Sequence, residues 1–175
     1  KPTEELQREL GLSHVVKLAS NENPLGPSKL AVQACRDAAQ GIHLYPDSSG
    51  FELKKKLCEK YGVQANQLTL GNGSNDVLDL IARAFLEPGK SAVFSAHAFV
   101  VYPIAVQACG ARGIVTPAKD WGHDLDAMAA AIEADTRVVF IANPNNPTGT
   151  WVDRAALEAF LAKVPEDVIV VLDEA

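Results

Sequence analysis

The chain has 175 residues, 47% of them apolar, and this length and composition suffice for one sizeable hydrophobic core. Its formal net charge of −6 argues against a nucleic-acid partner, because an acidic surface repels a phosphate backbone. The sequence has no run of eighteen apolar residues and no apolar segment behind a basic N-terminus, so we expect a cytoplasmic protein with no membrane partner.

The first part of the chain shows little regular pattern. Residues 21–27 (Asn-Glu-Asn-Pro-Leu-Gly-Pro) combine two prolines and a glycine, which forbid regular structure and predict an N-terminal arm. A helix is expected over about residues 28–40, followed by a turn at residues 45–47 (Tyr-Pro-Asp). Residues 54–56, three lysines, then form the solvated face of a helix whose other side is apolar.

From about residue 50 onward, helical patterns alternate with short β-rich runs. Strands are expected at residues 68–70, 92–95, 113–116, 138–142 and 168–172, all short and apolar enough to be covered on both faces. Helices are expected at residues 76–85 and 155–164, the second with Asp153 as its N-cap. This alternation predicts an α/β fold with a mostly parallel sheet sandwiched by helices.

The first candidate binding segment is residues 71–75 (Gly-Asn-Gly-Ser-Asn), between an expected strand and a helix. Free amides at a helix N-terminus suit a phosphate group, although an ordinary strand-to-helix turn explains the segment equally well. It does not match the dinucleotide fingerprint, since Asp76 replaces the third glycine, and the chain has no Gly-Lys-Ser/Thr of a P-loop.

The second candidate segment is residues 143–149 (Asn-Pro-Asn-Asn-Pro-Thr-Gly), directly after the expected strand 138–142. Two prolines stiffen this loop, so it could hold an asparagine amide at a fixed point at the carboxyl edge of the sheet. A simple turn is the alternative. The stiffness favours a binding role.

The third candidate is Asp173, at the carboxyl end of the most apolar expected strand. The strand and its Asp-Glu also resemble the Walker B segment of an ATPase, which keeps a nucleotide-binding ATPase domain as an alternative. Taken together, an anion-binding turn, a fixed amide and a carboxylate suit a ligand that carries a phosphate, a polar oxygen and a cationic ring nitrogen.

The order of these motifs resembles the fold-type I pyridoxal-phosphate enzymes. Residues 21–27, 45–47 and 144–149, with the final Asp-Glu-Ala, make the chain most similar to the first half of the histidinol-phosphate aminotransferase family. The resemblance implies an arm and small-domain segment at residues 1–45 and an incomplete large domain at residues 46–175. It implies transfer of an amino group between histidinol phosphate and 2-oxoglutarate through pyridoxal phosphate, in histidine biosynthesis.

The resemblance also assigns roles to the phosphate-binding residues. The amides of Gly73, Ser74 and Asn75 would hold the cofactor phosphate. Tyr45 would reach the cofactor phosphate of the neighbouring subunit, which implies a homodimer with shared active sites. Asn23 and Tyr45 are the implied substrate-side residues.

Three further residues would hold the cofactor ring. Phe99 would stack on it, where the family usually has a tyrosine, although a core phenylalanine is the alternative. Asn146 would donate its amide to the ring 3-oxygen. Asp173 would pair with the ring nitrogen and favour its protonated form, which makes this residue catalytic.

No lysine of this chain matches the family position that binds the cofactor. The chain begins with Lys1 and ends at Ala175, just after an apolar strand, so we expect both ends to be cut and the lysine and substrate arginines to lie further on. An aromatic aminotransferase or a phosphothreonine decarboxylase of the same fold remains an alternative, as does a fragment without catalysis.

The cysteines and most histidines are expected to have no catalytic role. The cysteines are odd in number and far apart, which predicts buried free thiols and neither a disulfide framework nor a metal site. Isolated histidines in turns are usually surface groups. The residues concerned are Cys35, Cys58, Cys109, His43, His97 and His123.

Overall fold

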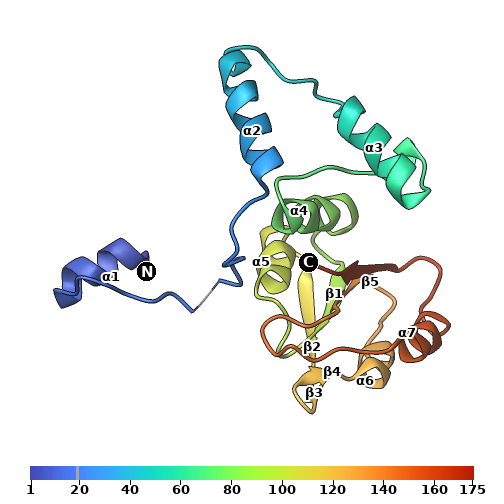
Figure 1. Ribbon diagram of the computed structural model, residues 1–175. Helices are drawn as coiled ribbons and strands as arrows, with labels where there is room; N and C mark the ends of the chain where they lie inside the picture. The colour runs from blue at the N-terminus through green and yellow to red at the C-terminus, as the bar shows by residue number, and fades with distance from the viewer. Residues whose placement is uncertain (19) are drawn as a thin grey trace. The chain divides into compact units, whose positions relative to one another are not determined.

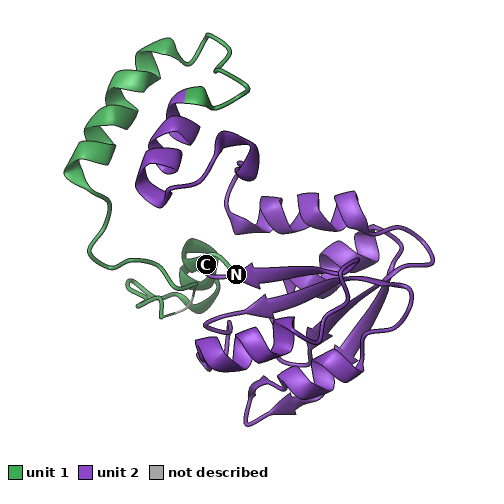
Figure 2. Ribbon diagram, turned by 90° about the vertical axis from the view of Figure 1, so that its right-hand side faces the viewer, with its two compact units in different colours: residues 1–51 green, residues 52–175 purple. Residues whose placement is uncertain are grey.

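The computed structural model describes residues 1–18 and 20–175 and divides the chain into two compact units, Lys1–Phe51 and Glu52–Ala175 (Figure 2). The first unit contains helices α1 (Thr3–Leu10) and α2 (Lys29–Ala38) and the short 3₁₀ helix η1 (Ala39–Gly41). Helix α2 confirms the helix expected at 28–40. Nowhere in the described chain is a helix both long and apolar enough to cross a membrane.

Helix α1 was not predicted, although its sequence carries helix-end signals. Glu4 and Glu5 lie in its first turn and Arg8 in its last, which suits the helix dipole. Gly11 follows with a left-handed backbone, φ 64°, which ends the helix as a glycine at this position commonly does.

The second unit is an α/β domain built on a four-stranded parallel sheet (Figure 1). Its strands lie in the order β2 (Arg112–Thr116), β1 (Ser91–Ser95), β5 (Thr136–Ala142), β6 (Ile169–Asp173). Its helices are α3 (Phe51–Tyr61, whose first residue belongs to the first unit), η2 (Ala65–Gln67), α4 (Ser74–Phe85), α5 (Val101–Ala108), α6 (Leu125–Ala130) and α7 (Arg154–Leu161). A small antiparallel hairpin, β3 (Ala118–Lys119) and β4 (Gly122–His123), connects β2 to α6.

Alternating side chains of the central strands fill two separate cores. Phe140 faces helices α4 and α5, where it joins Leu78 and Tyr102, among others. Ile141 faces α6 and α7, where it joins Met128 and Phe160. Since successive residues of a strand point to opposite faces, this is the sandwich of helices around a sheet that the apolar runs predicted.

Four of the five expected strands are confirmed, and the first is wrong. Residues 68–70 are extended at Leu68 (φ −115°, ψ 123°), but no described segment pairs with them, and a strand needs a partner for its amides and carbonyls. The last strand, β6, pairs only with β5 within the described residues, so Ile169 and Leu172 are 38% and 37% exposed instead of buried. Its apolar residues therefore lie at a sheet edge.

The expected helices at 76–85 and 155–164 appear as α4 and α7. The Asp153 side chain accepts a hydrogen bond from the Ala156 amide at 2.8 Å, which confirms the N-cap. Helix α3 has no buried residue; on its apolar side Leu57 is half-buried, and Phe51 and Leu53 are exposed. Cys35 is exposed and Cys58 and Cys109 are half-buried, so the expected burial of the thiols is wrong.

Candidate active site

Parallel pairing brings three chain segments to one edge of the sheet. Ala142 of β5 lies beside Asp173 of β6, and the Asn143 amide donates to the Asp173 carbonyl at 2.9 Å. Strand β1 ends at Ser95 on the same edge, and Phe99 lies in the segment that directly follows this strand. The carboxyl edge of a parallel sheet is where α/β proteins bind ligands.

The Asp173 carboxylate is held by one donor on each oxygen. The Tyr102 hydroxyl donates to Oδ2 at 2.8 Å, and the Ala175 amide donates to Oδ1 at 3.1 Å. The Asp173 residue is half-buried. The carboxylate thus has a fixed orientation and retains acceptor capacity for a further donor, such as a cationic N–H group.

Tyr102 connects Asp173 to the aromatic residues of the site. Its ring stacks on Phe140 with centroids 4.9 Å apart and planes at 11°, and it meets the Phe99 ring edge-on at 6.0 Å and 88°. Burial and the hydrogen bond to Asp173 raise the pKa of Tyr102 above its ordinary range, so its hydroxyl stays protonated. Tyr102 belongs to no motif that would mark it in the sequence, although it lies three residues after Phe99, and its amide donates to the Phe99 carbonyl at 3.1 Å in a turn.

The loop at residues 143–149 is held by its own hydrogen bonds. Asn143 Nδ2 donates to the Val152 carbonyl and its Oδ1 accepts from the Val152 amide, both at 3.0 Å. The Asn145 amide donates to the Thr150 carbonyl at 2.7 Å, and the Gly149 amide donates to the Asn145 carbonyl at 2.8 Å. Both Asn-Pro bonds of the loop are cis. These contacts agree with the stiffness expected from the two prolines.

The two central asparagines of this loop have different environments. Asn145 is 3% exposed; its Nδ2 donates to the His97 carbonyl at 3.0 Å and to Thr148 Oγ1 at 2.7 Å. Asn145 Oδ1 is buried without a hydrogen-bond partner among the described residues. Asn146, the residue singled out from the sequence, is half-buried. Asn145 therefore ties the loop to the segment after β1, while Asn146 faces an open pocket.

That pocket has a volume of about 490 Å³ and brings Phe99 and Asn146 together. Aromatic, amide and hydroxyl side chains contribute to its lining, which consists of His97, Ala98, Phe99, Val100, Trp121, Asn146, Pro147 and Thr148. Such a mixture of apolar surface and a few polar groups is typical of a small-molecule site. Asp173 is not in this lining; it reaches the same aromatic group through Tyr102.

Trp121 enters the pocket from the β3–β4 hairpin. Asp120 and Trp121 form its turn with φ of 50° and 65°, a left-handed conformation that is unfavourable for a bulky side chain. The Trp121 ring lies 5.0 Å from the His97 ring. Neither Trp121 nor His97 could be assigned to the site from the sequence, because only the fold brings the hairpin next to the loop at residues 143–149.

The N-terminus of α4 carries the expected phosphate-binding residues. Gly73, its N-cap, has φ 82°, and no side chain of the described residues caps this end. Ser74 and Asn75 open the helix with amides in its first turn, whereas the Gly73 amide already donates to the Gly71 carbonyl at 3.0 Å. The Asp76 carboxylate turns back to accept from the Asn72 amide at 2.9 Å. The accessible donors are therefore those of Ser74 and Asn75.

The two expected substrate-side residues lie in the first unit. Tyr45 is fully exposed there. Asn23 is exposed too, and its Oδ1 accepts from the Leu25 amide at 3.0 Å in a local turn. Asp47, of the Tyr-Pro-Asp turn, accepts from the Ser49 and Phe51 amides, and these bonds hold its pKa below the ordinary range.

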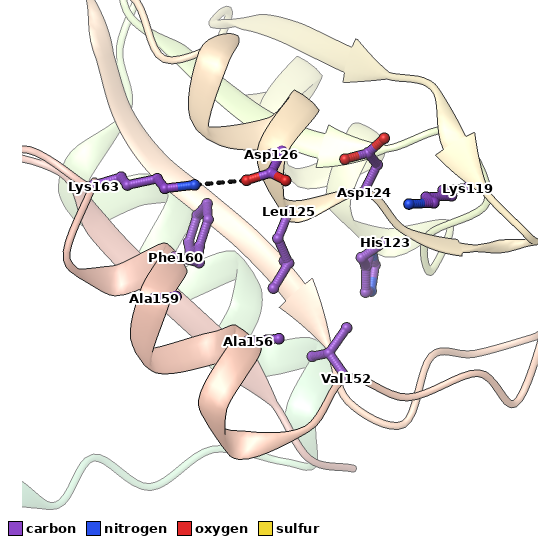
Figure 3. Close-up of a pocket in the computed structure, with 10 residues that line it drawn as sticks. All are labelled: Lys119, His123, Asp124, Leu125, Asp126, Val152, Ala156, Ala159, Phe160 and Lys163. Carbon is purple, nitrogen blue, oxygen red and sulfur yellow. Dashed lines mark hydrogen bonds and ion pairs between the residues drawn. The ribbon is translucent and has the colours of Figure 1, made fainter.

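A second hollow of about 290 Å³ lies between the hairpin, α6 and α7 (Figure 3). Lys163 and Asp126 form an ion pair of 2.6 Å at its border. His123 also lines it but is only 8% exposed, so its expected surface position is wrong: its Nε2 donates to the Ala142 carbonyl at 2.9 Å, and burial lowers its pKa. Its buried Nδ1 has no partner among the described residues and is out of contact with solvent.

The fold and the edge site together define an α/β domain that presents an aromatic ring, an amide and a carboxylate at the carboxyl ends of parallel strands. Comparisons with known proteins place this domain. The family model "Aminotransferase class I and II" matches residues 13–175. The chain belongs to the class I and II aminotransferase family.

The similar proteins include one named histidinol-phosphate aminotransferase 2 from Pseudomonas aeruginosa, 63% identical over 177 residues, which cover all of this chain and 48% of that protein. A solved histidinol-phosphate aminotransferase from Sinorhizobium meliloti, in complex with pyridoxal-5'-phosphate, superposes with a TM-score of 0.92 at 30% identity and covers all of this chain and 48% of its own. An aspartate aminotransferase from Rhizobium meliloti shares the fold, with a TM-score of 0.79 at 19% identity over 97% of this chain and 45% of its own.

These comparisons confirm the fold-type I architecture and the resemblance on which it was expected. The chain spans about half the length of the relatives it matches. Family membership favours an aminotransferase over the ATPase alternative, because the apolar strand with Asp-Glu occurs here within an aminotransferase domain.

Proposed function

We propose that the protein containing this chain is a pyridoxal-phosphate-dependent aminotransferase that moves an amino group between histidinol phosphate and 2-oxoglutarate. The observation that carries the proposal is the 63% identity along the whole chain to a protein named for this substrate. The similarity extends over the arm as well as the sheet, so it includes the segments proposed to face the substrate.

The residues of the carboxyl edge fit the cofactor. Phe99 and Asn146 line one pocket, which accommodates an aromatic ring with a hydrogen-bond donor beside it. The Asp173 carboxylate has capacity for a cationic ring nitrogen. The exposed N-terminus of α4, with the amides of Ser74 and Asn75, suits a phosphate.

When bound, the cofactor supplies an electron-withdrawing ring that stabilises the carbanion formed as the substrate loses its α-proton. The residues of this chain would keep that ring in its protonated form, which withdraws electrons most strongly. Asp173 holds a proton on the ring nitrogen, because an ionised carboxylate favours a cation beside it. Phe99 fixes the ring plane, and Asn146 directs its amide to the ring oxygen.

We propose that two kinds of residue lie outside this chain. One is the lysine that binds the cofactor covalently and moves the proton, since Lys90, Lys119 and Lys163 do not match its motif position. The cationic groups for the substrate phosphate are the other. Lys163 is besides engaged with Asp126 at 2.6 Å.

We also propose a homodimer with shared active sites. Tyr45, fully exposed in the first unit, would reach the cofactor phosphate of the neighbouring subunit, and Asn23 would lie on the substrate side. A mass in solution equal to two subunits supports this assembly, and a monomeric active enzyme contradicts it.

The test is a comparison of substrates with the full-length protein. With pyridoxal phosphate and 2-oxoglutarate present, we expect kcat/KM for histidinol phosphate to exceed that for phenylalanine or tyrosine by about 100-fold, since recognition of a substrate phosphate contributes several hydrogen bonds. Higher activity on aromatic amino acids, or release of carbon dioxide from phosphothreonine, would assign the protein to another branch of the fold.

A further inference from the structure

Tyr102 stands out among the residues near the site because, within the described part of the chain, its hydroxyl bonds to one residue, Asp173. The side chain is fully buried, and its hydroxyl donates to Asp173 Oδ2 at 2.8 Å. We propose that Tyr102 is a positioning residue: it aims the Asp173 carboxylate at the cationic nitrogen of the cofactor ring and keeps it aligned with the stacking residue Phe99. This inference rests on the proposed function of the site.

The ring of Tyr102 cannot easily turn the hydroxyl away. Phe140 stacks on one side of it at 4.9 Å, and Phe99 meets it edge-on at 6.0 Å. Because Phe140 is itself fully buried in β5, an interior strand of the sheet, the tyrosine ring packs against a close-packed part of the core. The hydroxyl therefore has one direction, toward Asp173.

The hydroxyl is also a permanent donor. Burial together with the neighbouring carboxylate raises the pKa of Tyr102, so the phenol remains protonated throughout the range in which an enzyme works. A phenol that donates to one carboxylate oxygen leaves the carboxylate charged. The hydrogen bond restricts rotation of the Asp173 carboxylate and leaves its other lone pairs free to accept from the ring nitrogen.

Two donors define the plane of the carboxylate. Tyr102 binds Oδ2, and the Ala175 amide binds Oδ1 at 3.1 Å. The same Tyr102 ring contacts Phe99, so one side chain sets both the residue above the cofactor ring and the residue at its nitrogen. A site needs its reacting groups held to within about 0.5 Å, and such supporting contacts supply that precision.

A merely structural role predicts something different. If Tyr102 only filled the core and satisfied its own hydroxyl, its loss would weaken every ligand of the pocket alike. A positioning role instead predicts a loss that appears only when the ligand carries a ring nitrogen that can hold a proton.

The experiment uses the full-length protein and two probes: pyridoxal phosphate, and its carbocyclic analogue in which a C–H group replaces the ring nitrogen. Tyr102→Phe keeps the packing and removes only the hydroxyl. We expect it to weaken binding of pyridoxal phosphate about tenfold, as the loss of a hydrogen bond to a charged group does, and binding of the analogue less than about twofold. Tyr61→Phe, which alters a tyrosine 61% exposed on α3, is the matched control and leaves both affinities unchanged.

Equal weakening of both probes by Tyr102→Phe, or no weakening of either, overturns the positioning role. Asp173→Asn separates this failure from a failure of the proposed function. If Asp173→Asn abolishes the preference for pyridoxal phosphate while Tyr102→Phe does not, only the role of Tyr102 is lost. If neither variant changes the preference, the ring-nitrogen role of Asp173 is lost too.

A second substitution guards against misfolding of Tyr102→Phe, which thermal unfolding of the cofactor-free protein would reveal. Incorporation of 3-fluorotyrosine at position 102 keeps the shape and the hydroxyl but strengthens the donor. The ratio of the affinity for pyridoxal phosphate to the affinity for the carbocyclic analogue then changes, while the affinity for the analogue itself stays the same. An unchanged ratio contradicts the proposal.

Discussion

The two edges of the parallel sheet use polar side chains in opposite ways. At the amino edge, Arg112 binds Glu133 at 2.6 Å and Asp135 at 2.9 Å. The Ser91 hydroxyl lies 3.1 Å from Asp135 Oδ1 and 3.0 Å from the Thr136 hydroxyl. Every residue of this cluster has a partner within the chain. The cluster therefore connects the first residues of β1, β2 and β5 to the loop between α6 and β5.

At the carboxyl edge, polar groups retain unused capacity. Asn145 Oδ1 and His123 Nδ1 are buried without partners among the described residues, Asn146 lines an open pocket, and Asp173 is half-buried. Buried polar groups normally have hydrogen-bond partners, so unpartnered groups gathered at one edge indicate that this edge has capacity for further hydrogen bonds. The amino edge satisfies its polar groups internally, whereas the carboxyl edge keeps polar groups available for the ligand that we propose.

The largest expected effect comes from exchanging one carboxylate at each edge. In the full-length protein, Asp173→Asn should lower kcat by about 100-fold or more, because it removes the carboxylate that we propose to pair with the cofactor ring nitrogen. Asp135→Asn should leave kcat within about twofold. Steady-state kinetics of the two variants measure this difference in kcat. Near-normal turnover of Asp173→Asn would remove that residue from the ring-nitrogen role.

A second comparison separates the two asparagines of the carboxyl-edge loop. Asn145→Ala should destabilise the protein by about 1–3 kcal/mol, because it removes the donor to the His97 carbonyl and to Thr148. Asn146→Ala should change stability by less than about 0.5 kcal/mol but weaken cofactor binding about tenfold. Denaturant unfolding and cofactor titration of both variants test this, and the reverse pattern would show that Asn145 is the ligand-facing residue.

The smallest effect is expected at the amino edge, and it depends on pH. Arg112 holds the pKa of Asp135 below its ordinary value through their hydrogen bond. The pair therefore contributes stability above the unfolded-state pKa of about 3.9, and this contribution is lost as the pH falls through the lower folded-state pKa. Arg112→Met should lower the Tm slightly and equally at pH 7 and pH 5, and by less at pH 3, where the carboxylate begins to be protonated.

Calorimetric melts of the wild type and of Arg112→Met at the three pH values measure this. Arg83→Met is the control, because the ion pair that Arg83 forms among the described residues is with Asp79, one turn away on an exposed face of α4. A difference between wild type and Arg112→Met that is as large at pH 3 as at pH 7 would mean that the arginine acts through packing and not through its charge.

Much of the fold could be predicted because the signals are local. Short apolar runs located β1, β2, β5 and β6, and Asp153 marked the start of α7. Residues 68–70 show the limit of that reasoning, since an extended apolar run becomes a strand only if another segment pairs with it. The exposure of Leu172 shows the same limit, because burial depends on neighbours that an apolar pattern does not specify.

The sequence by itself determined the alternating α/β plan, the stiff Asn-Pro loop and the family to which the chain belongs, because each depends on residue types at fixed short spacing. Only the tertiary structure decided that Asn145 is buried and Asn146 lines the pocket, and that Trp121 joins that pocket. It also decided that Tyr102 meets Asp173, which lies 71 residues further along the chain. Such contacts arise from strand order and register, which place distant residues at one edge of the sheet.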